Sequence, residues 1–453
     1  MLRAVISVVL FAWAGDSAWA SVWPRIVNGV ASATDPAVVM VAFYADASQT
    51  ELVGLCSGSL IGCRTVVTAA HCVCPDTSED YASCTSAGVS DPRTVAVFVP
   101  HVGLLPVESI VVHPSYEFGT GYDASLLRLA ANAESVPPLP LATSEPPAGS
   151  VGRVIGYGTT RSGFRSVDDT GIKREGPVVF GTCPPDVAAD LNLCWTFTGT
   201  GSNTCSGDSG GAVVAKDDRG EALVGVVSGG TSVDCLAPDE SFATSVAALR
   251  DWIVANAGGD VGVACDTNGL VNDGQTIVQT FSANLDASNP QFQQRIEVPA
   301  DAVELRVTFN GQTGNASGFL NRDNDFDLFV GPVSSGGQAE WVCRDQRPEN
   351  WGACRVQSPR AGAWFVEVRR IAGAGPAQVT VTIPRAPACP GDCNGDHSVD
   401  VSEIVTAVNI LLGFTQLNSC GAADRNNDGA ITVDEVIQAV QAVLGGCSLQ
   451  PTS

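Results

Sequence analysis

The sequence is poor in basic residues and, after its first twenty residues, has no apolar stretch long enough to cross a bilayer. Lysine occurs only at positions 173 and 216, and 24 basic residues face 48 acidic ones, for a formal net charge of −24. Such a charge repels phosphate backbones and anionic lipid surfaces, so no nucleic-acid partner is expected. A membrane-spanning helix needs about 20 apolar residues, so no membrane span is expected either.

Length and composition bound the architecture. A chain of 453 residues is too long for one hydrophobic core, and ordinary domain sizes predict about three units. The 48 glycines and 26 prolines separate short β-branched runs, which predicts a mainly β protein. Sixteen cysteines are typical of an exported protein, because disulfides persist in oxidising compartments.

Residues 1–20 have the pattern of a secretory signal peptide. Arg3 precedes an apolar run over 4–14, and Ala18-Trp19-Ala20 is a small-x-small cleavage pattern. A membrane anchor is the alternative, but Gly-Asp-Ser at 15–17 interrupts the run too early. We therefore expect a secreted, extracellular protein whose chain begins at Ser21 after cleavage.

Residues 26–258 have an all-β pattern closed by one helix. Short runs such as 38–44, 94–99 and 223–227 predict strands. Residues 245–257 predict the helix, with an apolar face at Val246, Leu249, Ile253 and Val254. A pair of β-barrels with a terminal helix fits this pattern.

Three short motifs in this region carry the groups needed for acyl transfer. That chemistry requires a hydroxyl nucleophile, a base, a carboxylate that orients the base, and donors for the oxyanion. Ser209 lies in Gly207-Asp208-Ser209-Gly210-Gly211, whose glycines allow a tight turn. His71 lies in Thr68-Ala69-Ala70-His71-Cys72, and Asp123 in the segment Tyr-Asp-Ala-Ser-Leu-Leu-Arg-Leu at 122–129.

These motifs, in the order His, Asp, Ser, resemble the chymotrypsin (trypsin-like) family over roughly half of the chain. The resemblance implies that Ser209 is the nucleophile, His71 the general acid and base, and Asp123 the orienting residue. It also implies an oxyanion hole made by the N–H groups of Gly207 and Ser209. The expected activity is that of a serine endopeptidase acting on proteins or peptides, with no cofactor required for the catalytic chemistry.

A fourth motif, Arg25-Ile26-Val27-Asn28-Gly29, resembles the activation junction of that family. Residues 21–25 would then be a propeptide, and an activating protease would cleave after Arg25. The freed amine of Ile26 would pair with Asp208, because a buried carboxylate without a partner is costly. The alternative is that Arg25 begins an ordinary first strand.

The sequence departs from trypsin in the specificity pocket that the family resemblance implies. The position six residues before the nucleophile, an Asp in trypsin-like enzymes, is Asn203 here. Ser228, Gly230 and Ser241 should line the pocket, and the Ser241 side chain should narrow it. We expect a preference for small or medium neutral side chains over Arg or Lys, although Asp239 and Glu240 lie nearby.

The family resemblance also implies three disulfides, Cys56–Cys72, Cys183–Cys194 and Cys205–Cys235. The remaining cysteines of this region suggest Cys74–Cys84 and, as a hypothesis, Cys63–Cys265.

Residues 259–274 have the composition of a linker, and residues 275–386 alternate like the strands of a β-sandwich. This second unit resembles the bacterial prepeptidase C-terminal domain in its Asp-Phe-Asp-Leu-Phe-Val run at 325–330 and its Gly-Ala-Trp-Phe run at 362–365. Cys343 and Cys354 are expected to pair. Asp323, Asp325 and Asp327 could bind Ca²⁺, but a solvated acidic turn is the favoured interpretation.

Residues 387–448 contain a repeat with a 32-residue spacing from Asp392 to Asp424. Each copy has oxygen-bearing residues at EF-hand loop positions and runs into an apolar-faced helix, which resembles a dockerin-type pair and predicts structural calcium. Position 6 is Gly429 in the second loop but His397 in the first, which should weaken the first site. Cys389, Cys393, Cys420 and Cys447 should pair in one of three ways, and a cohesin-like partner is an open expectation. The predicted ligands are Asp392, Asn394, Asp396, Ser398, Asp400 and Glu403, then Asp424, Asn426, Asp428, Ala430 (carbonyl), Thr432 and Glu435.

Two functions therefore remain. One is an active secreted endopeptidase with accessory units. The other is a catalytically silent adhesion or interaction protein on the same fold, because fold does not guarantee function. Silent relatives usually lose a triad residue, and none is lost here, which favours the enzyme.

Overall fold

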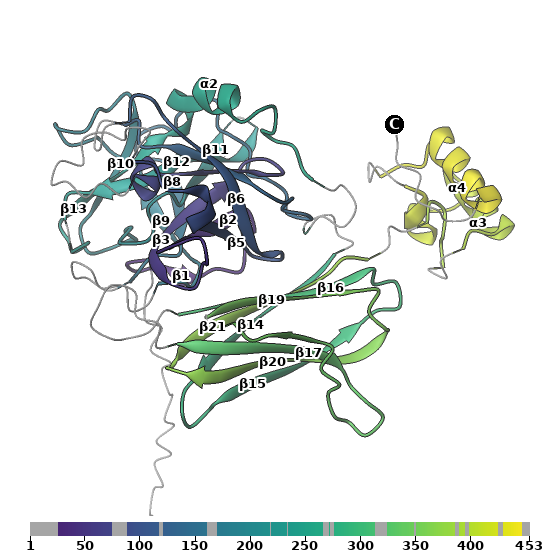
Figure 1. Cartoon of the computed structure of the whole chain (residues 1–453). Helices are drawn as coiled ribbons and strands as arrows, with labels where there is room; N and C mark the ends of the chain where they lie inside the picture. The colour runs from purple at the N-terminus through teal and green to yellow at the C-terminus, as the bar shows by residue number, and fades with distance from the viewer. Residues whose placement is uncertain are drawn as a thin grey trace, which may run out of the picture.

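The computed structural model describes residues 26–74, 88–116, 121–160, 170–217, 219–232, 234–265, 271, 276–312, 324–347, 350–385, 389–394, 398–424 and 429–445. In these stretches the chain forms three units (Figure 1). No helix in the described part of the chain combines the length and apolarity needed to cross a membrane.

The first unit contains a closed six-stranded barrel and a seven-stranded antiparallel sheet. The barrel has the order β2 (Val38–Tyr44), β3 (Leu52–Leu60), β4 (Thr65–Thr68), β7 (Ser125–Leu129), β6 (Gly103–Val112) and β5 (Val95–Val99). The sheet has the order β1 (Val30–Ala31), β9 (Arg174–Val179), β8 (Val151–Gly156), β11 (Ala212–Asp217), β12 (Gly220–Gly230), β13 (Asp239–Ser245) and β10 (Asn192–Phe197).

Strand β2 shows why these runs read as continuous apolar segments in the sequence. All seven of its residues are buried, because successive side chains point to opposite faces and both faces are covered. Val39, Val41 and Phe43 belong to one core with Val66, while Met40 and Ala42 belong to another core that includes residues of the seven-stranded sheet. The strand therefore joins the two halves of this unit.

Helix α2 (Val246–Asn256) closes the first unit, and the Ser245 hydroxyl caps its N-terminus by accepting from Ala248 N–H at 3.3 Å. Val246, Leu249 and Ile253 are buried as expected, but Val254 is exposed. Beyond α2, the Asp260 carboxylate accepts from the N–H groups of Cys63 and Arg64 at 3.0 and 2.8 Å. The segment predicted as a linker thus remains attached to the first unit at its start.

The second unit consists of two four-stranded antiparallel sheets around one apolar core, and we call it the two-sheet unit. Asp325 and Asp327 lie in strand β17 (Asp325–Pro332), where Asp327 is buried, so the expected solvated turn is wrong for these two residues. Asp323 lies outside the described residues. One sheet has the order β14 (Ile277–Leu285), β21 (Gly375–Ile383), β16 (Glu304–Gly311) and β19 (Trp351–Gln357), and the other β15 (Gln291–Val298), β20 (Gly362–Ala372), β17 (Asp325–Pro332) and β18 (Cys343–Asp345).

The third unit holds the helices α3 (Val401–Leu411) and α4 (Val433–Gly445). The expected apolar faces were Ile404, Val405, Val408 and Leu411 in the first helix and Val436, Ile437, Val440 and Val443 in the second. Val405, Ile437 and Val440 are instead exposed, and the small residues Ala407 and Ala439 are buried. Ala407 belongs to a small core with Cys420, Ala423 and Ile431, and a Cβ added at Gly391 would lie 2.5 Å from Ala439 Cβ. Neighbouring loop segments therefore decide which helix positions are buried, which the apolar pattern alone does not reveal.

Six disulfides lie within the described residues. Cys63 pairs with Cys265, which carries the attachment of the first unit past residue 260. Cys74 and Cys389 are also disulfide-bonded, whereas Cys84 and Cys447, their candidate partners, lie outside the described residues. The other five bonds are Cys56–Cys72, Cys183–Cys194, Cys205–Cys235, Cys343–Cys354 and Cys393–Cys420.

Candidate active site

His71 and Asp123 lie next to each other at one end of the paired barrel strands β4 and β7. His71 lies on the one-turn helix α1 (Ala70–Val73) directly after β4, and Asp123 lies just before β7, the strand that pairs with β4. Nδ1 of His71 donates to Oδ2 of Asp123 at 2.7 Å, and the backbone N–H of His71 donates to Oδ1 at 3.0 Å. These two hydrogen bonds to Asp123 fix the orientation of His71 and leave Nε2 as the ring nitrogen that can take a proton.

The electrostatics of this pair suit a general base. Burial disfavours the charged imidazolium, but the charge and hydrogen bond of Asp123 outweigh it and raise the pKa of His71 above its usual 6.5. Burial alone would raise the pKa of Asp123, yet His71 and Ser228 together lower it. The Asp123 side chain is fully buried while that of His71 is 22% exposed, so the base is accessible and its carboxylate is not.

Ser209 lies against the segment that carries His71. Its carbonyl oxygen accepts from Ser57 N–H at 2.8 Å and lies 3.8 Å from Sγ of Cys72, the residue after His71. Gly210 has a left-handed φ of +79°, and a Cβ there would collide with Thr68 Oγ1 and Ala69 N. Only glycine lets this turn pack so closely against residues 68 and 69. The turn therefore places Ser209 beside the segment that carries His71, and both residues are partly exposed.

The predicted oxyanion loop is built around the buried carboxylate of Asp208. Oδ1 accepts from Gly158 N–H at 2.8 Å, and Oδ2 accepts from Cys205 N–H at 3.0 Å. A Cβ at Gly156 or Gly158 would collide with this carboxylate, which explains both glycines of the Gly-Tyr-Gly run. Gly207 itself has a φ of +92°.

Ile26, the other half of the predicted activation pair, is fully buried in the core of the seven-stranded sheet. In the uncut chain its nitrogen is an amide and carries no charge, and Asp208 is stabilised by the backbone donors named above. Arg25 lies outside the described residues.

Asn203 lies at the buried base of the predicted pocket and contacts Asp239. Its Nδ2 donates to Oδ2 of Asp239 at 2.7 Å, and its Oδ1 accepts from Ser241 Oγ at 2.7 Å. Asp239 is 2% exposed and also accepts from Ser232 N–H at 2.8 Å. A Cβ at Gly230 would lie 2.9 Å from Asp239 Oδ2, so this carboxylate borders the wall formed by Gly230.

Two functional contacts were not foreseen from the sequence. The hydroxyl of Ser228, expected in the pocket wall, donates to Asp123 Oδ2 at 2.6 Å and so faces the triad. The hydroxyl of Ser57 donates to the Gly207 carbonyl at 2.9 Å and accepts from Tyr157 N–H at 2.8 Å. Ser57 opens the buried Ser-Gly-Ser run of β3, and a polar residue in a buried strand was the available signal for the second contact.

The predicted calcium loops are described in part. Asp400 and Glu403 form a capping box on α3, and Glu403 Oε1 also accepts from the N–H groups of Cys393 and Asn394 at 2.8 and 3.1 Å. In the second loop Asp424 accepts from Gly429 N–H at 2.9 Å. Within the described residues no three acidic, histidine or cysteine side chains form a metal-binding group. Asp396, His397, Asn426 and Asp428 lie outside those residues.

Comparison with known proteins finds relatives of the first unit. The family model described as Trypsin matches residues 26–253. Tryptase of Mus musculus is 31% identical over 235 residues, which are 46% of this chain and 80% of that protein. Trypsin zeta of Drosophila melanogaster is 30% identical over 222 residues, 44% of this chain and 73% of the relative.

A third relative, Trypsin delta of Drosophila erecta, is 30% identical over 245 residues, 51% of this chain and 88% of the relative. These matches confirm the predicted double-barrel trypsin-like fold for this half of the chain and its activity as a serine-type endopeptidase. The chain belongs to the trypsin family of serine proteases.

Proposed function

We propose that the chain is a secreted endopeptidase that cleaves peptide bonds through an acyl-enzyme on Ser209. His71 Nε2 takes the hydroxyl proton as Ser209 Oγ attacks the carbonyl carbon, and it then gives that proton to the leaving amine. Water repeats the sequence and releases the acid. The N–H groups of Gly207 and Ser209 hold the oxyanion. The observation that carries the proposal is the 2.7 Å bond between His71 and Asp123 beside the Ser209 turn.

A fluorophosphonate probe separates this enzyme from a silent interaction protein. The cleaved chain should be labelled on Ser209, as located by peptide mass spectrometry. Ser209→Ala and His71→Ala should both abolish labelling, while the first variant should melt at the parent temperature. A parent chain that is folded and cleaved after Arg25 but remains unlabelled would support the silent alternative.

We propose that the protein is made as a zymogen. The support is that Asp208 is buried beside the nucleophile, where the amine of a newly formed N-terminus at Ile26 would neutralise it. Arg25→Gln should block processing and keep labelling slow, and treatment with a trypsin-like activating protease should not rescue it. If the uncut chain labelled as fast as the cut one, the zymogen proposal would be wrong.

For the pocket we propose a preference for small or medium neutral side chains before the scissile bond. Asn203 carries no charge, and the Ser241 side chain occupies space beside it. Asp239 is the acid at this site, but hydrogen bonds from Asn203, Ser232 and Thr231 already stabilise its carboxylate. A peptide-library profile with equal or greater cleavage after Arg would refute this preference.

We propose that the third unit binds structural calcium and that the second and third units are accessory to the protease. The support is an all-oxygen ligand set repeated at the same loop positions, with Glu403 and Glu435 both buried at the ends of their loops. The likeness to dockerin makes a cohesin-like protein the partner to test. A pull-down with a purified cohesin-like domain, with and without calcium, tests that binding.

A further inference from the structure

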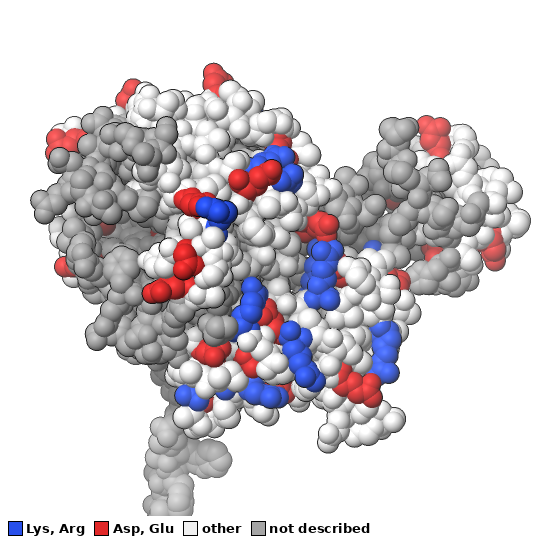
Figure 2. Space-filling model, in the orientation of Figure 1, with Lys and Arg blue, Asp and Glu red and all other residues white. Residues whose placement is uncertain are grey.

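The two-sheet unit packs on the catalytic unit through the sheet that contains β21, β16 and β19 (Figure 1). Trp351 of β19 belongs to a core of the catalytic unit. Nδ1 of His101 lies 2.7 Å from Oγ1 of Thr382, and burial lowers the pKa of His101 to about 3. Figure 2 shows that basic side chains gather on the two-sheet unit in this view. One of them, Arg355, forms an ion pair with Glu134 of the catalytic unit, at 2.6 Å.

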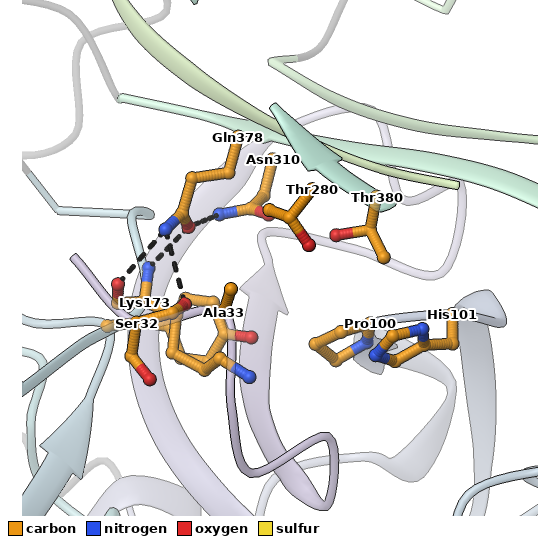
Figure 3. Close-up of a pocket in the computed structure, with 10 residues that line it drawn as sticks. Ser32, Ala33, Pro100, His101, Lys173, Thr280, Asn310, Gln378 and Thr380 are labelled. Carbon is orange, nitrogen blue, oxygen red and sulfur yellow. Dashed lines mark hydrogen bonds between the residues drawn. The ribbon is translucent and has the colours of Figure 1, made fainter. Parts of the chain in front are cut away.

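Gln378 on β21 holds a backbone segment of the catalytic unit. Its Oε1 accepts from Lys173 N–H at 3.0 Å, and its Nε2 donates to the Lys173 carbonyl at 3.2 Å. The same Nε2 donates to the Ser32 carbonyl at 3.4 Å. This side-chain amide therefore pairs with Lys173 as a neighbouring strand would, and joins it to the segment that follows Ile26 (Figure 3).

Asn310 on β16 supports the same segment. Its Nδ2 donates to the Gly171 carbonyl at 2.8 Å and to Gln378 Oε1 at 2.8 Å. Gln378, Asn310 and Lys173 line a small cavity that Tyr157 also borders (Figure 3). Gln378 and Asn310 are both buried, so water cannot readily replace these bonds.

From this segment a short series of hydrogen bonds leads to the oxyanion loop. Gly171 N–H donates to the Tyr157 carbonyl at 2.9 Å, and Arg174 Nη1 donates to the Gly158 carbonyl at 3.0 Å. Gly158 N–H in turn donates to the Asp208 carboxylate at 2.8 Å. Residues 171–174, held from one side by the two-sheet unit, thus hold the turn that wraps around Asp208.

We propose that Gln378 and Asn310 are positioning residues for catalysis, through which the two-sheet unit keeps the oxyanion loop in its working geometry. The inference rests on the proposed function of Ser209. Coupling of this kind travels through packed hydrogen-bonded elements, and here the links are buried backbone groups, two side-chain amides, the Arg174 guanidinium and the Asp208 carboxylate. The two-sheet unit would then be an internal activator of the protease, in addition to any binding role.

Full-length variants, cleaved after Arg25, test this role. Gln378→Met keeps the side-chain volume but removes the amide, and Asn310→Ala is a second variant that removes the donor to the Gly171 carbonyl. Thr382→Val is the matched control, because it removes the buried hydroxyl that bonds His101 on the same strand without touching residues 171–174. The readouts are the rate of Ser209 labelling by a fluorophosphonate, the fraction of sites finally labelled, kcat, KM and the melting temperature.

We expect Gln378→Met to slow labelling and lower kcat about tenfold, the size of one or two lost buried hydrogen bonds, with all sites still labelled in the end. Asn310→Ala should act in the same direction, and Thr382→Val should change the rate less than about twofold even where it lowers the melting temperature equally. Equal effects of Gln378→Met and Thr382→Val would overturn the inference. A parent chain that does not label would overturn the proposed function and this inference with it.

Discussion

Replacing Ser57 by alanine should test how the oxyanion loop is held within the catalytic unit. The hydroxyl is fully buried and joins the Gly207 carbonyl to Tyr157 N–H. Ser57→Ala leaves both groups without this partner, and each buried unsatisfied group costs about 1–3 kcal/mol. We expect the free energy of unfolding to fall by about 3 kcal/mol and the rate of Ser209 labelling to fall about tenfold.

Ser59→Ala is the matched control for this experiment. Ser59 is equally buried, lies two residues further along β3, and its hydroxyl has no hydrogen-bond partner among the described residues. Its removal should leave stability unchanged or slightly raised, because no bond is lost and a buried polar group disappears. Urea unfolding gives the free energies, and fluorophosphonate labelling gives the rates. If Ser57→Ala and Ser59→Ala behaved alike, the bridging role of Ser57 would have to be given up.

Three further predictions follow from the site. The pKa of His71 is raised above 6.5 and the base must be neutral, so kcat/KM should fall about tenfold per pH unit below a midpoint at or above 6.5; a profile that stays flat to pH 5 would contradict this. Asn203→Asp adds a carboxylate at the pocket base and should raise cleavage after Arg relative to Ala in a peptide library; a parent that already prefers Arg would assign that role to Asp239. Calcium should raise the melting temperature of the third unit by mass action and Glu403→Gln should reduce the shift; identical melting curves with calcium and with a chelator would exclude a structural ion.

The local features of the catalytic unit could be predicted from the sequence because short-range chemistry determines them. The run at 38–44 is the strand β2, since a stretch with both faces buried must be apolar throughout. The helix predicted at 245–257 is α2, with Ser245 as its cap. The motif around Ser209 needs glycines at 207 and 210 for left-handed backbone, and that requirement is visible in the sequence itself.

Contacts between distant segments could not be predicted in this way. Asp239 reaches Asn203 only because β13 pairs with β12 and β10, so that residues 36 positions apart share the base of one pocket. Asp325 and Asp327 read as an acidic turn, but the register of β17 against β20 places them in a strand. Val254 satisfies the helical period yet faces solvent, because the catalytic unit covers only one side of α2.

The sequence by itself determined which residues could perform acyl transfer, since the nucleophile, the base and the turn each require particular residue types in short motifs. Only the tertiary structure decided what supports them: Ser228 on Asp123, Ser57 under Gly207, and Gln378 of another unit on Lys173. The physical reason is that a motif is specified by local backbone and side-chain chemistry. A supporting hydrogen bond depends on which distant strands the folding of the whole chain brings together.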